Sequence, residues 1–281
     1  MRICTIVYNG MEQAAILRDE DLILVTDIND AFQTEFPVTL LQLLAQGQLD
    51  VLRQLYVSRS MAHLPTLHVH SNQLQMPYRE AHHIFGVGMN YVEKLEDLQA
   101  ERAEEPVIFM KPNSSMISEG DAIRLPTTAK EVSAEGELAL IIGKACTNVS
   151  EADAPNYIAA YTTSLDMTAR DIHAKNPRFM QISKVFPTFF SFGPVLTTPD
   201  EVEDIAMLTV QSVHNGQVIH ENSIAHMMYS PAYIVSYIST FITLQPGDII
   251  MTGTPGSFIV QSGDAASCVI SGLPILQNKV I

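Results

Sequence analysis

The start of the chain alternates between short apolar runs and turn-forming residues, a pattern typical of β-strands. Asn9-Gly10 and an acidic stretch at 19–21 separate the apolar runs. The sequence therefore predicts short strands within residues 3–8, 14–17 and 22–28.

A helical spacing of apolar residues follows Pro37. Leucines and a valine recur from Leu40 to Leu55, and Gly47 can break the helix between them. Residues 58–77 are irregular and polar, so we place a domain boundary near residue 78. This predicts a small N-terminal α+β domain, 1–77, and a larger domain, 78–281.

Strand patterns dominate the larger domain. Apolar runs occur at 83–88, 107–111 and 138–142, and the last is long enough for a fully buried strand. Asn215-Gly216 between alternating apolar residues predicts a type I′ hairpin. Ser230-Pro231 predicts the start of a helix over 232–241. The fold class predicted is α+β and strand-rich.

Charge narrows the range of partners. The chain has 281 residues, 47% of them hydrophobic, and 31 acidic against 16 basic residues give a net charge of −15. Such a chain would be repelled by nucleic acid and by an anionic membrane surface, so we expect it to bind neither. If its substrate is an anion, a metal or a local group of cations has to bind it.

The cysteines and the apolar runs indicate the compartment. The three cysteines are far apart and form no CxxC pair, so we expect no disulfide framework and no structural zinc site. No apolar stretch reaches the ~20 residues of a membrane span, and the first run is too brief for a signal peptide. We expect a cytoplasmic protein.

Three carboxylates form the most informative pattern. Glu135 and Glu137 lie two residues apart in a predicted strand and therefore point to the same face. Asp166 follows another apolar run, 158–165. If the two strands meet, these carboxylates converge and favour a hard divalent metal. From spacing alone, however, Glu-x-Glu is weak evidence for a metal, because the pattern is more often found on a solvated strand edge.

The chain from about residue 83 onward resembles the fumarylacetoacetate hydrolase family. The segments that carry the resemblance are GVGMNY (86–91), PVIFMKP (106–112), AEGELALIIGK (134–144), AAYTTSLDMTARD (159–171), KVFPTF (184–189), FGP (192–194), LQPGDIIMTGTP (244–255) and a closing GLPILQN. They occur in the family's order, and their joint occurrence is specific.

The resemblance implies a fold, a cofactor and a substrate class. The fold is a mixed β-roll in which Glu135, Glu137 and Asp166 bind Mg²⁺, Mn²⁺ or Ca²⁺. The metal would act as a Lewis acid on a small anionic oxo-acid and stabilise its enolate. A homodimer is also implied.

Other residues match positions of the family's substrate pocket. The resemblance assigns substrate contacts to Tyr91, Lys111, Arg170, Thr188 and Thr254. It places Lys184 among the catalytic residues. For Arg170, an ion pair with Asp166 or Asp171 is an equally good interpretation.

The chain departs from the family where hydrolytic members carry a His and, three residues later, a Glu that activate water. Here those positions hold Lys94 and Asp97, and the family's glutamine seven residues after the metal Asp is His173. A lysine is protonated at neutral pH unless it is desolvated, so it is a poor base. Lys94, Asp97 and His173 are the alternatives for acid–base catalysis.

Three functions remain open. The first is hydrolysis of a C–C bond in an acylpyruvate-type acid, and the second is decarboxylation or keto–enol isomerisation of an oxaloacetate-like acid. The third is a catalytically weak protein that binds a metal and an oxo-acid. Residues 93–105 are rich in acids and have helical propensity, so they are either a lid over the site or a solvated helix.

Overall fold

The computed structural model describes residues 1–69, 74–93 and 104–281. Among these residues the strands form a larger mixed sheet and a smaller one. The larger sheet contains β1 (Arg2–Tyr8), β2 (Met11–Arg18), β3 (Asp21–Leu24), β4 (Leu67–His68), β5 (Leu74–Gln75), β6 (Ile84–Gly88), β7 (Val107–Met110), β8 (Met116–Ile117), β10 (Val132–Ile142), β11 (Ile158–Ala169), β12 (Phe190–Phe192), β13 (Val195–Thr197), β16 (Ile249–Met251) and β17 (Ser257–Val260). The smaller sheet contains β9 (Ala122–Ile123), β14 (Thr209–His214), β15 (Gln217–Ser223), β18 (Ala265–Ile270) and β19 (Leu276–Val280).

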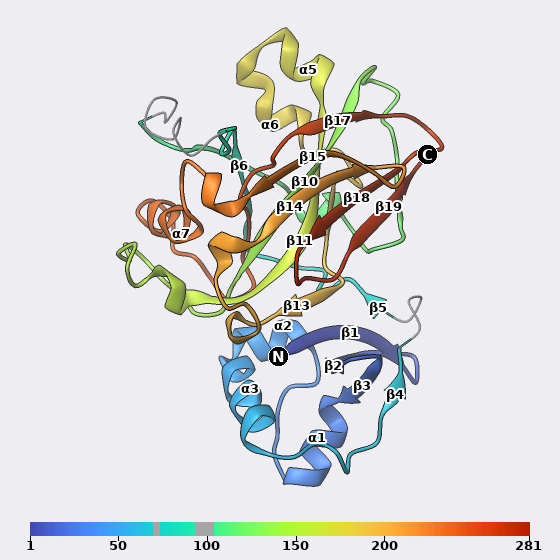
Figure 1. Ribbon diagram of the computed structural model, residues 1–281, viewed down its shortest axis with the longest axis vertical. Helices are drawn as coiled ribbons and strands as arrows, with labels where there is room; N and C mark the ends of the chain where they lie inside the picture. The colour runs from blue at the N-terminus through green and yellow to red at the C-terminus, as the bar shows by residue number, and fades with distance from the viewer. Residues whose placement is uncertain (70–73, 94–103) are drawn as a thin grey trace.

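Helices are short and lie at the periphery. They are α1 (Val25–Phe32), α2 (Leu40–Ala45), α3 (Gln48–Ser58), α5 (Arg170–Lys175), α6 (Met180–Ser183) and α7 (Pro231–Ser239). Figure 1 shows α1–α3 with β1–β4 at one end of the molecule, and α5 and α6 at the other. This arrangement confirms the strand-rich α+β class. No helix in the described part of the chain is long and apolar enough to cross a membrane.

The long antiparallel hairpin of β10 and β11 divides the core. Leu138 and Leu140 pack toward the smaller sheet, whereas Ala139 and Ile141 pack toward the N-terminal helices. Side chains alternate along a strand, so every odd-numbered residue from 135 to 141 lies on the same face of β10 as Ala139 and Ile141. Glu135 and Glu137 therefore point away from the smaller sheet.

The N-terminal strands join the same sheet as the rest of the chain. Strand β1 pairs with β13 in antiparallel register, with Ile3 opposite Leu196. The core on that side also mixes residues from both parts, such as Leu43 and Ile141. The boundary near residue 78 stays a prediction, because these contacts describe a shared sheet and core rather than a dividing line.

Several local predictions are confirmed, and one is wrong. Asn215 and Gly216 have positive φ of 51° and 80° and connect β14 to β15, as the hairpin motif predicts. The Ser230 hydroxyl caps α7 by accepting the Tyr233 N–H. The predicted strand over 22–28 is wrong in its second half, because α1 begins at Val25. Val25 and Ile28 are both buried, a spacing of three that suits a helix.

Candidate metal centre

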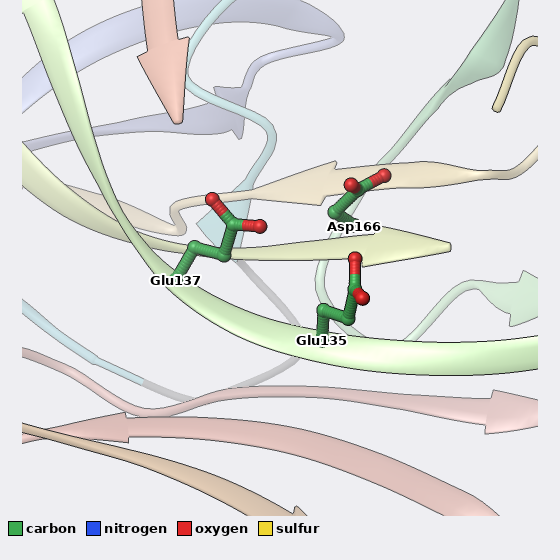
Figure 2. Close-up of side chains that lie close together, drawn as sticks. All are labelled: Glu135, Glu137 and Asp166. Atoms are coloured by element: carbon green, nitrogen blue, oxygen red, sulfur yellow. The ribbon is translucent and has the colours of Figure 1, made fainter. Parts of the chain in front are cut away.

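The β10–β11 hairpin brings Glu135, Glu137 and Asp166 together. Glu135 lies directly opposite Asp166 in the antiparallel register, and Glu137 lies opposite Ser164. One carboxylate oxygen from each residue lies within 4.8 Å of the others. Figure 2 shows the carboxylates on two adjacent strands, close together. The convergence predicted from the sequence is present.

Glycine between the two glutamates allows β10 to pack closely on the smaller sheet. A Cβ on Gly136 would lie 2.9 Å from the Gln211 carbonyl oxygen and 3.3 Å from Cys268 Sγ. The Gly136 N–H donates a hydrogen bond of 3.0 Å to Ser212 Oγ. The Glu-Gly-Glu triplet thus presents two acids on one face and a tight backbone contact on the other.

Burial strengthens the interactions among the carboxylates. Glu137 and Asp166 are fully buried, and the Glu135 side chain is 18% exposed. Burial and the nearby charges of Asp166 and Glu135 raise the pKa of Glu137 well above its usual range. Burial alone would also raise the pKa of Asp166, but Lys111 and Lys184 outweigh it and lower that pKa.

Lys111 lies behind the carboxylates. Its Nζ is 2.6 Å from Asp166 Oδ1, and it donates to the carbonyl oxygens of Met167, Lys184 and Phe189 at 2.7–3.1 Å. Its side chain is completely buried, and burial lowers its pKa to about 8 against the attraction of Asp166. Lys111 supplies positive charge within the protein, and its direct contact with a substrate stays a prediction.

Lys184 lies on the less buried side of the same cluster, beside Glu135. Its Nζ donates to Glu135 Oε2 at 3.1 Å, to Thr168 Oγ1 at 2.9 Å and to Asp166 Oδ2. Burial alone would lower the pKa of Lys184, but Asp166 and Glu135 outweigh it and raise that pKa. Lys184 is therefore a charged ammonium group in direct contact with two of the acids.

An aromatic ring holds the lysine from its apolar side. The Lys184 ammonium lies 4.3 Å from the centre of the Phe109 ring, within the range of a cation–π interaction. The ring fits there because residue 86 is glycine, whose added Cβ would lie 2.1 Å from it. Our sequence reasoning missed Phe109 as a site residue, although it lies in the VIFMK segment.

A buried amide fixes the backbone beside Glu137. Glu137 Oε2 accepts the Gly253 N–H at 2.6 Å, and Gly253 has a φ of 100° that favours glycine. Asn90 donates to the carbonyl oxygens of Thr252 and Tyr229 at 2.8 and 3.0 Å and accepts the Tyr229 N–H. Asn90 was also missed, although it precedes Tyr91 in a segment that carries the resemblance.

Tyr91 and Thr254 border the cluster. The Tyr91 hydroxyl is buried and has no hydrogen-bond partner in the described part of the chain. Burial and the Glu137 charge raise its pKa well above its usual range. Thr254 Oγ1 donates to the Gly256 carbonyl oxygen at 3.0 Å and accepts its N–H, which shapes the turn before β17. Their substrate contacts stay predictions.

Two further predicted residues, Thr188 and Arg170, contact residues other than the three carboxylates. Thr188 has a φ of 70°, unusual for a β-branched residue, and its hydroxyl accepts the Arg124 N–H at 2.9 Å. Arg170 Nε lies 3.7 Å from Glu131 Oε1, so its ion-pair partner is neither Asp166 nor Asp171.

His173 is half-buried on α5, the short helix that continues directly from β11. Lys94 and Asp97 lie outside the described residues, as does most of the lid predicted at 93–105. The acid–base assignments of all three residues therefore stay predictions.

The donor set fits a hard divalent cation. It consists of three carboxylates, and only Glu135 and Asp166 have a lysine within ion-pair distance among the described residues. Glu137 is buried with only a backbone N–H as its hydrogen-bond donor there. Oxygen ligands with an excess of negative charge are what Mg²⁺, Mn²⁺ and Ca²⁺ prefer.

The chain belongs to the fumarylacetoacetate hydrolase family. The family model described as fumarylacetoacetate (FAA) hydrolase C-terminal matches residues 83–281. The mitochondrial oxaloacetate tautomerase Fahd2a of Rattus norvegicus is 32% identical over 267 residues, which cover 92% of this chain and 84% of that protein. These matches confirm the resemblance inferred from the sequence segments.

Solved structures extend the likeness over the whole chain. Fumarylacetoacetate hydrolase from Exiguobacterium antarcticum superposes with a TM-score of 0.86 and 26% identity, covering 100% of this chain and 99% of that one. Maleylpyruvate hydrolase from Sphingobium sp. SYK-6, in complex with manganese(II) and pyruvate, superposes with a TM-score of 0.80 and 25% identity. It likewise covers 100% of this chain and 99% of that one. Relatives thus include both hydrolases and tautomerases.

Proposed function

We propose that this chain catalyses the keto–enol tautomerisation of oxaloacetate or a closely related 2-oxo diacid, with a divalent metal held by Glu135, Glu137 and Asp166. The observation that carries the proposal is a buried acid–lysine cluster able to stabilise an enolate, in a chain with Lys94 at the family's water-activating His position. The likeness to the rat oxaloacetate tautomerase over 92% of the chain supports it.

Tautomerisation requires fewer catalytic groups than hydrolysis does. The keto and enol forms interconvert through an enolate, so the site has to stabilise negative charge on oxygen and move a proton at carbon. No water molecule attacks the substrate, so a His–Glu pair for activating water is not required. A metal bound by the three carboxylates would supply Lewis-acid polarisation of the 2-oxo group.

The residues of the chain have separate roles in this proposal. Lys184 donates from its ammonium group to the enolate oxygen. Lys111 stays buried and offsets the charge of Asp166. We assign the proton transfer at C3 to His173, a half-buried residue on the helix that continues directly from β11. Tyr91, Arg170, Thr188 and Thr254 are proposed to position the substrate.

Hydrolysis of an acylpyruvate-type acid is the second candidate. The structural likeness to a maleylpyruvate hydrolase with bound manganese(II) and pyruvate favours it. In that reaction Lys94 with Asp97, or His173, would have to activate water. The third candidate is a protein that binds a metal and an oxo-acid with weak catalysis or none.

One assay separates these candidates. Purified protein with Mn²⁺ or Mg²⁺ is mixed with oxaloacetate enriched in its enol form, and separately with an acylpyruvate. A faster loss of enol absorbance without pyruvate release supports tautomerisation. Pyruvate release from the acylpyruvate supports hydrolysis, and pyruvate from oxaloacetate supports decarboxylation. If no reaction is accelerated, the third candidate, a protein that only binds a metal and an oxo-acid, is favoured and the proposal is contradicted.

Metal identity, assembly and localisation are further proposals. We propose Mg²⁺ or Mn²⁺ as the bound ion, on the basis of the carboxylate donor set and of the manganese(II) in the maleylpyruvate hydrolase complex. We also propose a homodimer in the cytoplasm, on the basis of the resemblance and the sequence. Light scattering on a size-exclusion column tests the dimer, and fractionation of cells tests the compartment.

A further inference from the structure

Lys184 and a bound metal would compete for the same carboxylate groups. The Lys184 ammonium contacts Glu135 Oε2 at 3.1 Å and Asp166 Oδ2, which belong to two of the three proposed metal ligands. Its remaining hydrogen bond goes to Thr168 Oγ1 at 2.9 Å. All three donors of the ammonium group are therefore used within the cluster.

Lys111 and Lys184 differ in how easily their ammonium groups could move away from the carboxylates. Lys111 is completely buried and donates to three backbone carbonyl oxygens, so its position is fixed by the fold. The Lys184 side chain is 9% exposed, and its acceptors are all side chains. The Lys184 ammonium can therefore move away from the carboxylates without breaking a hydrogen bond to a backbone carbonyl.

We propose that Lys184 is an internal cation that competes with the metal. Its ammonium neutralises Glu135 and Asp166 until a divalent ion binds, and metal binding then releases it toward the substrate. That Lys184 neutralises the two carboxylates and competes with the metal stands on the contacts alone. Its release toward the substrate rests on the proposed function. Metal loading would thereby make available the ammonium group that binds the enolate oxygen.

The proposal has a thermodynamic consequence. If the metal displaces Lys184 from the carboxylates, Lys184 in turn lowers the affinity for the metal by the same factor. A unit positive charge about 4 Å from an ion changes its affinity by well over tenfold at the dielectric typical of protein sites. Lys184 therefore weakens metal binding, in contrast to a residue that merely supports the metal ligands.

Binding of Mn²⁺ to substituted proteins tests whether Lys184 competes with the metal. Free Mn²⁺ is measured by electron paramagnetic resonance with wild type, Lys184→Met, Lys184→Arg and Lys279→Met. Lys279 is exposed on β19 and controls for the change in net charge. We expect Lys184→Met to bind Mn²⁺ at least about tenfold more tightly than wild type, and the other two to stay within about threefold. Equal or weaker binding by a folded Lys184→Met protein would overturn the proposal.

Amine labelling of the wild-type protein needs no variant and tests the release of Lys184. The protein is treated with an acetylating reagent with and without Mn²⁺, and the modified lysines are quantified by mass spectrometry. We expect Mn²⁺ to increase acetylation of Lys184 several-fold, to leave Lys279 unchanged and to leave Lys111 unmodified. Added oxalate, an anionic substrate analogue, should protect Lys184 again. Acetylation of Lys184 that stays constant or falls with Mn²⁺ contradicts the release, whatever the catalytic assays show.

Discussion

Glu135 and Asp166 lie opposite each other on β10 and β11, and the Lys184 ammonium contacts both of their carboxylates. The antiparallel pairing that brings the acids together is long and continues on both sides of this pair, from Val132 opposite Ala169 to Ile142 opposite Ile158. The acids are therefore fixed by the sheet rather than by a loop. A rigid frame of this kind suits a site that has to hold a metal and a planar enolate in one geometry.

Replacing Glu137 by Gln is expected to impair metal binding while keeping the fold. The amide oxygen can still accept the Gly253 N–H, so the local backbone should persist. Losing an outer partner of a metal ligand typically costs 10- to 100-fold in affinity, and we expect at least about 100-fold for this ligand. Titration calorimetry with Mn²⁺ measures the change.

Glu203→Gln is the matched control for that substitution, since Glu203 is exposed and makes the same change in charge. Its Mn²⁺ affinity should equal that of wild type. An unchanged affinity in Glu137→Gln would remove Glu137 from the ligand set.

The pH dependence of stability should also report on Glu137. Because its pKa is raised in the folded protein, the folded state keeps a proton that the unfolded state has released above about pH 4.3. Between that pH and the folded pKa the folded state binds more protons, so this group lowers the free energy of unfolding as pH rises.

Urea denaturation with a chelator present measures this effect. The free energy of unfolding of wild type minus that of Glu137→Gln should decrease as pH rises from about 4.3. Asp166 has a lowered pKa and acts in the opposite direction, but it is common to both proteins. A difference that does not vary with pH would mean that Glu137 is not desolvated.

Gly136→Ala is expected to destabilise the protein by about 1–3 kcal/mol. The new Cβ would meet the Gln211 carbonyl oxygen and the side chains of Cys268 and Ser212, none of which can move far within the packed sheets. Gly88→Ala is the control, because its Cβ would be 3.6 Å from Val107, an ordinary contact. Chemical denaturation of both proteins measures the effect, and equal stabilities would contradict the close packing behind β10.

Asn90→Ala is expected to weaken both stability and metal binding. It leaves two buried carbonyl groups and one N–H without their side-chain partner, each costing about 1–3 kcal/mol. The Gly253 turn that contacts Glu137 should loosen as a result. Asn113→Ala removes similar bonds at an exposed position and should cost much less. Thermal unfolding and Mn²⁺ titration of the two variants check this.

Sequence reasoning could predict features that depend on local periodicity. Glu135 and Glu137 share a face because side chains alternate in a strand, and the Asn215-Gly216 turn follows from the φ values that the turn requires. The helix at α1 was missed because a short apolar run followed by Thr26 and Asp27 fits either structure. Its N-cap residue, Leu24, makes no side-chain capping bond that could have indicated the start.

Contacts between distant segments could not be derived in the same way. That Lys111 and Lys184 both pair with Asp166 depends on how β7, β11 and the chain after α6 pack together. The approach of Phe109 to Lys184 depends on the missing Cβ of Gly86, which no periodic pattern shows. The family resemblance suggested these lysines, but only the structure shows that they contact the acids.

The most direct test of the central claim is the rate at which enol-oxaloacetate becomes the keto form with Mn²⁺-loaded wild type and with Glu137→Gln. We predict that wild type accelerates the conversion at least roughly tenfold more than the variant, with no matching release of pyruvate. Equal rates for the two proteins, and for wild type in the presence of a chelator, would contradict a metal-dependent tautomerase at this site.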